Sequence, residues 1–200
     1  MTIRSSKLSR VFVTVTLISF LSLPITVWAA PCSQASGSPC KTIRNTAQQV
    51  LRILESSLAK RTRGLQNLLD EVWFEILPHV DPCGMAMRSL PPDYLLHMTK
   101  LEKEEFTNIY TRLLIKEYSL VLRRFSKDTK LRLFYDDETI DGGYARVKSR
   151  LITPEGEYVI SYRLYLDREN WLIYDISHDS VSQVENYRAQ FNRIGKKVSY

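Results

Sequence analysis

Apolar residues recur at intervals of three and four over much of the first two thirds of the chain, the spacing of amphipathic helices. Arg61–Gly64 interrupts the first stripe and Pro78 ends the second. A short segment around 85–90 follows, and Thr99 stands at capping-box spacing before Glu102, where the last stripe begins. The predicted helices cover residues 42–60, 65–77, 93–98 and 101–125.

Near Lys130 the apolar period changes to the two-residue alternation of strands. A final helix is predicted over 181–194, after a second capping-box spacing at Ser180 and Gln183. The predicted strands cover residues 131–135, 145–152, 158–166 and 171–176. Several helices, an antiparallel sheet and one more helix predict an α+β domain, with helices packed on one face of a four-stranded sheet.

Thr153–Gly156 predicts a tight hairpin turn, because proline occupies its second position and glycine its fourth. In the resulting register, four cross-strand pairs lie on one mostly apolar face of the hairpin. These pairs are Leu151 with Tyr158, Ser149 with Ile160, Val147 with Tyr162, and Ala145 with Leu164. A slip of one residue would mix this face with the polar one, so the pattern specifies the register.

A second turn, at Asp167–Asn170, would place Ile173 beside Leu164 and Asp175 beside Tyr162. Arg188 in the final helix is hypothesised to tie that helix to the sheet through an ion pair with Asp175.

The N-terminus has the order of a secretory signal: Arg4, Lys7 and Arg10, then an apolar run, then small residues at the predicted cleavage site after Ala29. Three parts are therefore expected: a signal peptide over 1–29, a flexible segment over 30–41 and a single domain over 42–200. Lipidation at Cys32 is disfavoured, because proline precedes it.

Removal of the leader takes away three of the 28 basic residues and none of the 22 acidic ones, so the net charge falls from +6 to +3. This excess lacks the concentrated basic stripe of nucleic-acid binders, and no nucleic-acid partner is expected. Export would expose Cys32, Cys40 and Cys83 to an oxidising compartment. We hypothesise a disulfide between Cys32 and Cys40 across the flexible SQASGSP segment, which leaves Cys83 unpaired.

Catalytic patterns are scarce: the sequence contains no G-x-S-x-G elbow, no Gly-rich phosphate loop and no H-E-x-x-H. His79, Asp81 and Cys83 alternate in one predicted loop, yet their spacing matches no standard zinc site. Cys83 with His79 as its base is a conceivable nucleophile, whereas a small buried thiol in a plain loop is the favoured interpretation. No catalytic residue, metal or cofactor is predicted.

Two side-chain groups have two interpretations each. The hairpin register places Arg146 opposite Arg163 on the polar face, where they form either an anion site or a solvated surface. An aromatic set either lines a pocket or packs the core. This set consists of Tyr158, Tyr162, Tyr165, Trp171 and Tyr174.

The C-terminal third carries three short motifs in succession. They are a Y-x-L strand at Tyr162 and Leu164, a W-x-x-Y-D strand at Trp171, Tyr174 and Asp175, and N-Y-R-x-Q-F at Asn186, Tyr187, Arg188, Gln190 and Phe191. With them, roughly residues 41–194 resemble the MlaC family of periplasmic phospholipid carriers, also called the toluene-tolerance family. Ser180 replaces a glycine usual in the family, and the segment His79–Cys83 lacks the family's aromatic residue.

The resemblance implies a periplasmic carrier, not an enzyme, with a nuclear-transport-factor-like fold. Such a carrier moves phospholipid between an outer-membrane lipoprotein and porin complex and an inner-membrane ABC transporter. A branch of the family associated with hopanoid metabolism makes another amphiphile an alternative ligand. The residues expected to line the lipid site are Leu69, Trp73, Phe106, Leu113, Val147, Leu151, Tyr158, Ile160, Tyr162 and Leu164. Two other classes stay open: a periplasmic enzyme using Cys83 and His79, and a ligand-free scaffold that binds partner proteins.

Overall fold

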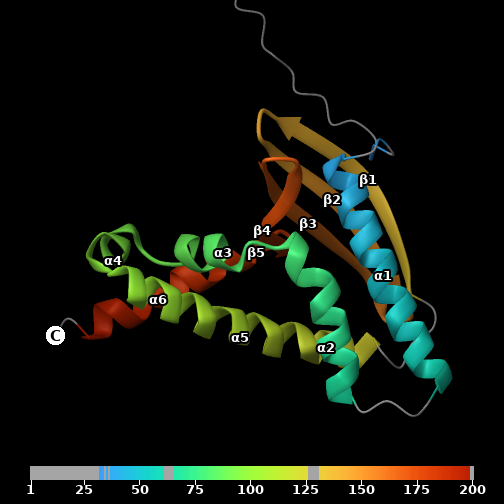
Figure 1. Cartoon of the computed structure of the whole chain (residues 1–200), viewed down its shortest axis with the longest axis horizontal. Helices are drawn as coiled ribbons and strands as arrows, with labels where there is room; N and C mark the ends of the chain where they lie inside the picture. The colour runs from blue at the N-terminus through green and yellow to red at the C-terminus, as the bar shows by residue number, and fades with distance from the viewer. Residues whose placement is uncertain (1–31, 34, 36, 61–64, 126–130, 199–200) are drawn as a thin grey trace, which may run out of the picture.

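Six α-helices and one short 3₁₀ helix pack against an antiparallel sheet in the computed structural model, which describes residues 32–33, 35, 37–60, 65–125 and 131–198 (Figure 1). The predicted leader and the interruption at Arg61–Gly64 lie outside the described residues. The helices are α1 (Pro39–Lys60), α2 (Leu65–Ile76), η1 (Leu77–His79), α3 (Pro82–Arg88), α4 (Pro92–His97), α5 (Lys100–Phe125) and α6 (Gln183–Val198). The strands are β1 (Arg132–Asp141), β2 (Tyr144–Thr153), β3 (Gly156–Asp167), β4 (Asn170–His178) and β5 (Val181–Ser182).

The predicted α+β class is confirmed, with differences in several elements. α1 begins at Pro39 rather than at Thr42, and β1 continues to Asp141 instead of ending at Tyr135. The two-residue strand β5 adds a fifth strand to the four predicted. Within the part of the chain that the structure describes, every helix is too short or too polar to cross a bilayer.

The sheet has the order β1-β2-β3-β4-β5, with each strand antiparallel to the next. The predicted β2–β3 register is confirmed at every pair, from Thr153 opposite Gly156 to Ala145 opposite Leu164. In the next pair of strands Ile173 lies opposite Leu164 as predicted, but Asp175 lies opposite Arg163 rather than Tyr162. An irregularity between Arg163 and Leu164 shifts the register there, which the turn alone could not reveal.

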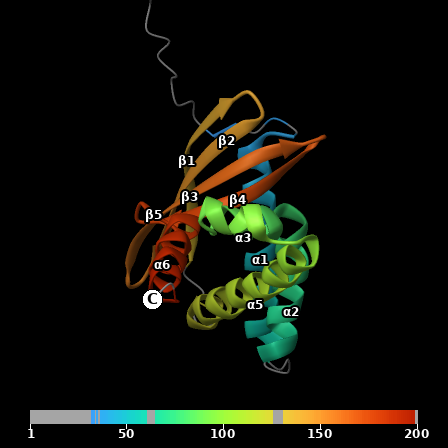
Figure 2. The ribbon, with the colours of Figure 1, turned by 90° about the vertical axis from the view of Figure 1, so that its left-hand side faces the viewer.

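The inner face of the sheet, which carries Val147 and Leu164, packs against the first turns of α1 at Cys40 and Ile43. The outer face carries Arg146, Lys148 and Arg150 in alternation with these residues. α3 and α6 contact β4 at the far end of the sheet, and α5 lies against α3. Figure 2 shows the strands spread as one layer above the helices α3, α5 and α6.

The predicted N-terminal cap is present in α5 but not in α6. Thr99 and Glu102 form the predicted capping box of α5, with the Thr99 backbone N–H donating to Glu102 Oε2 at 2.7 Å. For α6 the prediction of Ser180 was wrong, because Ser182 Oγ accepts from the Glu185 N–H at 3.1 Å. Ser180 instead adopts a positive φ of 70° between β4 and β5.

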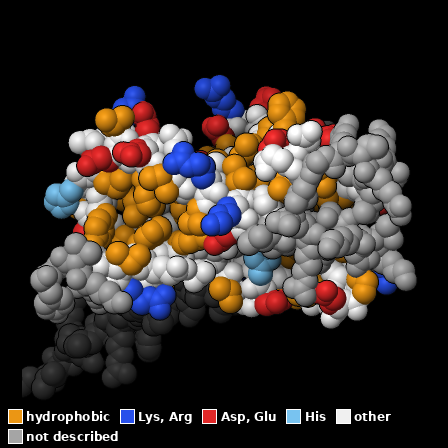
Figure 3. All heavy atoms as spheres, turned by 90° about the horizontal axis from the view of Figure 1, so that it is seen from below, with side chains coloured by type: hydrophobic (Ala, Val, Ile, Leu, Met, Phe, Trp, Pro, Cys, Tyr) orange, Lys and Arg blue, Asp and Glu red, His pale blue; other side chains and the backbone are white. Residues whose placement is uncertain are grey.

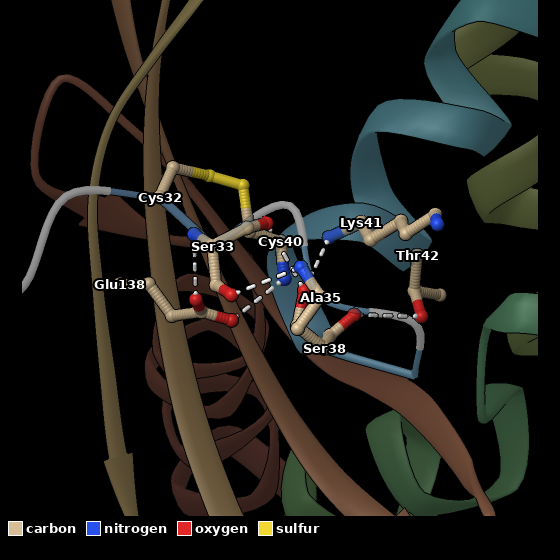
Figure 4. The surroundings of a disulfide bond; sticks show 8 residues. All are labelled: Cys32, Ser33, Ala35, Ser38, Cys40, Lys41, Thr42 and Glu138. Carbon is tan, nitrogen blue, oxygen red and sulfur yellow. Dashed lines mark hydrogen bonds between the residues drawn. A yellow bond between two sulfur atoms is a disulfide. The ribbon is translucent and has the colours of Figure 1, made fainter.

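Cys32 and Cys40 form the hypothesised disulfide, with their Cα atoms 5.7 Å apart (Figure 4). Glu138 of β1 binds the backbone on both sides of this bond, at the N–H groups of Ser33 and Cys40. The indole Nε1 of Trp171 donates to the carbonyl oxygen of Gly37 at 3.0 Å in the loop that the disulfide closes. These contacts hold the segment before α1 on the sheet.

Candidate functional site

The inner face of the sheet is fully covered at one end and partly uncovered at the other. Val147 and Leu164 are completely buried beneath the first turns of α1. Toward the Thr153–Gly156 turn, the predicted site residues are only half-buried. These half-buried residues are Leu151, Tyr158 and Ile160. Tyr162 is also half-buried but lies opposite Val147, at the covered end. Alternation along β2 and β3 therefore places an apolar platform at the turn end that helices cover incompletely.

On the helical side, Leu69 and Trp73 of α2 are both buried. The Trp73 indole Nε1 donates to Ser119 Oγ of α5 at 3.4 Å, and the Trp73 ring lies edge-on to Tyr118 with centroids 6.3 Å apart. These contacts join α2 to the second half of α5.

Phe106 and Leu113 lie in a different cluster, with residues of α3 and α6. The Phe106 ring contacts Phe191 of α6 edge-on, with centroids 5.5 Å apart. The ten predicted residues are thus divided among the sheet face, α2 and the α3–α5–α6 cluster. They do not all lie in one hydrophobic cluster.

Tyr118 contacts one of the predicted site residues and was not among those that the sequence analysis named. Its ring contacts Trp73 and also His178 of β4, with centroids 6.1 Å apart, so it lies between α2 and the sheet. Burial raises the pKa of Tyr118, and the neighbouring Tyr110 and Tyr162 raise it further. Tyr118 stands four residues after Leu114 and so continues the apolar stripe of α5. This spacing could have identified it from the sequence.

Several polar side chains end inside this otherwise apolar region. Tyr118 OH and Ser149 Oγ are buried without a hydrogen-bond partner among the described residues. Burial raises the pKa of Tyr162. Burial also raises the pKa of Tyr135, whose ring lies under the Arg44 guanidinium at 4.4 Å. Such a lining can bury hydrocarbon and still offer hydroxyl groups to polar atoms of a ligand.

The aromatic set of the C-terminal third divides between the two faces. Tyr158 and Tyr162 lie on the inner face, and Trp171 is buried in the cluster beneath α1. Tyr165 and Tyr174 contact each other with ring centroids 6.2 Å apart and are covered by Arg88 of α3.

Hydrophobic side chains also gather on the surface over the ends of α5 and α6 (Figure 3). In these two helices Leu101, Ile109 and Ile194 are exposed, and Phe106 and Phe191 are half-buried. The α3–α5–α6 cluster therefore extends to the surface.

The structure shows no hydrogen bond between Cys83 and His79. Cys83 is exposed in the first turn of α3, not buried as the favoured interpretation held, because α3 begins at Pro82 and turns it outward. Asp81 caps α3 by accepting from the Gly84 N–H at 2.7 Å, and it accepts from Tyr165 OH at 3.0 Å. Among the described residues, no group of three or more His, Cys, Asp or Glu side chains is arranged to hold a metal ion.

The hypothesis of an ion pair between Arg188 and Asp175 was wrong. Arg188 donates from Nε to the carbonyl oxygen of Arg88 at 2.7 Å, so it ties α6 to α3. Asp175 accepts from the Val184 N–H at 3.1 Å and pairs with Arg163 at 3.5 Å. The register shift in β4 turns Asp175 toward the start of α6, whereas Arg188 lies further along that helix.

Comparison with known proteins identifies the family of the chain and a solved structure with a similar fold. A sequence model of the family described as MlaC protein matches residues 44–199. A solved structure of the phospholipid-binding protein from Ralstonia solanacearum, in complex with a phospholipid, has a similar fold with a TM-score of 0.70. The two proteins are 19% identical, and the match covers 80% of this chain and 88% of the other. No curated protein sequence matches this chain.

Proposed function

The chain belongs to the MlaC family, and we propose that it is a carrier that binds a phospholipid and shields its hydrocarbon tails from water. Each buried CH₂ group gains about 0.8 kcal/mol, so a tail of about 16 carbons gains roughly 13 kcal/mol. Release of the lipid to a partner then needs only a competing apolar environment, and no catalytic group takes part.

One observation carries the proposal: an apolar platform on β2 and β3 is left half-buried beside helices that carry large apolar side chains. A chain that used this face only as its core would bury it fully, as it does at Val147 and Leu164. We assign Leu151, Tyr158 and Ile160 to one wall of the lipid site. Leu69 and Trp73 form the facing wall, and Phe106 and Leu113 extend it toward the surface over α5 and α6.

We further propose that the protein works in the periplasm and exchanges lipid with an inner-membrane ABC transporter and an outer-membrane lipoprotein and porin complex. The signal-like N-terminus and the disulfide between Cys32 and Cys40 support an oxidising compartment outside the cytoplasm. Family membership supports the two partners.

Native mass spectrometry of protein purified from the periplasm tests the proposal directly. A mass excess of one phospholipid per chain is expected, and lipid extraction followed by fragmentation identifies the head group. A hopanoid mass would assign the alternative amphiphile. A protein that is empty, and that takes up no lipid from added phospholipid vesicles, would contradict a carrier function.

Neighbouring residues of β3 provide a matched pair of variants. Ile160 points into the proposed site and Val159 points outward, 41% exposed. Ile160→Asp is expected to abolish lipid occupancy, because a carboxylate would be buried against hydrocarbon, while Val159→Asp keeps it. Leu151→Trp adds volume without charge and is expected to reduce occupancy. Circular dichroism establishes that each variant is folded before its occupancy is compared.

The enzyme alternative has its own test. Cys83→Ala removes the exposed thiol from α3 without touching the inner face of the sheet. Lipid occupancy is expected to be unchanged in this variant. A hydrolytic activity that disappears with Cys83 while lipid binding persists would instead favour the enzyme.

A further inference from the structure

Three cations line the outer face of β2, and two of them have a carboxylate partner on β1. Lys148 Nζ lies 3.3 Å from Asp137 Oδ2. Arg150 Nη2 lies 2.8 Å from Asp136 Oδ1, and Arg150 Nε donates to both oxygens of the same carboxylate. A carboxylate of β1 therefore balances the charge of each of these two cations.

Arg146, the third cation, has different neighbours. Across β1 it faces the neutral Thr139, and across β3 it faces Arg163. Its guanidinium makes no ion pair with any residue that the structure describes. Like charges directly opposite each other destabilise a sheet, so an anion between Arg146 and Arg163 would relieve their repulsion.

Arg163 is held in position by carboxylates of β4 and α6. Its Nη1 lies 3.5 Å from Asp175 Oδ2 and 3.3 Å from Glu185 Oε1. Asp175 is buried and is itself fixed by the start of α6. Both ion pairs use Nη1, so the remaining guanidinium nitrogens of Arg163 have no recorded partner among the described residues.

A pocket of about 340 Å³ opens at this place on the outer face, at the small end of the range for ligand sites. Thr139, Arg146 and Arg163 line it in one cross-strand row. The rings of Tyr144 and Tyr174 close one side, edge-on with centroids 6.2 Å apart. The opposite face of the same strands carries the proposed lipid site, so the two sites are separate.

We propose that this pocket binds a phosphate group between the guanidinium groups of Arg146 and Arg163. Guanidinium presents paired N–H donors that match two phosphate oxygens, and the Thr139 hydroxyl adds a third donor to the row. The carboxylate of Asp141 also lines the pocket and opposes the anion, so binding is expected to be weak. The phosphate belongs either to a small soluble ester or to a lipid head group at a membrane surface.

Titration of the ¹⁵N-labelled full-length mature protein with inorganic phosphate and with glycerol 1-phosphate, followed by NMR, tests the site. Saturable shifts centred on Thr139 and Arg146 are expected. Arg146→Gln should weaken binding at least tenfold, while Lys148→Gln, which removes the same charge from the same strand, should leave it unchanged. An equal loss in both variants would show general electrostatic attraction and overturn the proposal.

Co-sedimentation with vesicles identifies the source of the phosphate. Vesicles containing phosphatidylglycerol are compared with vesicles of phosphatidylcholine alone, using wild type and Arg146→Gln. Arg146-dependent sedimentation with phosphatidylglycerol supports the site and assigns it to a head group. Arg146-dependent binding of glycerol 1-phosphate without such sedimentation supports the site and assigns it to a soluble ester. Absence of both refutes it.

Discussion

Glu138 accepts a hydrogen bond from the backbone N–H of Cys40 across 98 positions of sequence, at 2.9 Å. Its second carboxylate oxygen accepts from the Ser33 N–H at 3.0 Å (Figure 4). The Glu138 residue is only 4% exposed, so one buried carboxylate on β1 satisfies two backbone donors beside the disulfide. The start of α1 is thereby placed on the inner face of the sheet.

Glu138→Ala is expected to lower the free energy of unfolding by about 3 kcal/mol, because two backbone N–H groups lose a charged acceptor in a buried place. Urea denaturation followed by circular dichroism measures the change. Glu105→Ala, an exposed position on α5, is the control and is expected to have little effect. Equal urea midpoints for the two variants would show that the hydrogen bonds of Glu138 do not stabilise the fold.

Cys32→Ser opens the loop that the disulfide closes. The loss of this cross-link is expected to reduce the free energy of unfolding by roughly 2–3 kcal/mol, mainly through the greater entropy of the unfolded chain. Treatment of the wild type with a reductant should give a similar loss, whereas Cys83→Ser, at an exposed free thiol, should change little. A reductant effect that persists in Cys32→Ser would contradict this assignment.

Asp175 should be coupled energetically to Arg163 and not to Arg188. In a double-mutant cycle, Asp175→Asn with Arg163→Gln is expected to give a coupling energy of about 1 kcal/mol, since the two side chains form a partly buried ion pair. The cycle with Arg188→Gln is expected to give a value near zero, because Arg188 binds the Arg88 carbonyl oxygen. The reverse ranking would restore the original hypothesis.

Burial raises the pKa of Tyr110 to about 12, with the Ser89 hydroxyl opposing the shift and the charges of Asp175 and Glu117 adding to it. The unfolded chain ionises its tyrosines near pH 10. Stability that is full below about pH 10 is therefore lost as the pH rises toward about 12, because the unfolded state releases its proton first. Tyr110→Phe should lose less stability between pH 9 and pH 11 than the exposed control Tyr94→Phe, as measured by urea midpoints.

Tyr118→Phe removes a buried hydroxyl that has no hydrogen-bond partner among the described residues. In protein stripped of lipid, the variant is expected to be more stable than the wild type by about 1 kcal/mol, since an unsatisfied polar group leaves the interior. Thermal unfolding measures the difference. If the hydroxyl contacts the ligand, lipid occupancy in native mass spectra will fall in the same variant. A clear loss of stability in the lipid-free state would show that the hydroxyl has a partner.

The β2–β3 register was predictable because its determinants are local. Strict alternation leaves one arrangement with all apolar side chains on a single face, and Thr153–Gly156 aligns the strands. The same reasoning worked at Ile173 and failed at Asp175, because a register shift in the adjoining strands depends on what packs around it. The prediction that Ser180 caps α6 was wrong for a similar reason. The strand β5 follows Ser180, so the helix begins only at Gln183.

The candidate site was predictable on the sheet and only in part on the helices. Period-two alternation identifies Val147, Ile160 and Leu164 as one face, whatever covers them. The stripe of α5 could not show that Phe106 packs with α6 while Tyr118 reaches toward the sheet. A helical stripe indicates which side is apolar, but the crossing of neighbouring helices decides what each turn meets.

The amino-acid sequence by itself determined the order of most helices and strands and the hairpin register, because periodicity and turn chemistry act over a few neighbouring residues. Its three C-terminal motifs indicated the family. Only the tertiary structure decided the charged partners: Glu138 with the segment before α1, Asp175 with the start of α6, and Arg163 with Asp175 and Glu185. A buried or cross-strand charge takes its partner from whatever segment folding brings within a few ångströms, and that distance is set by the packing of the whole domain.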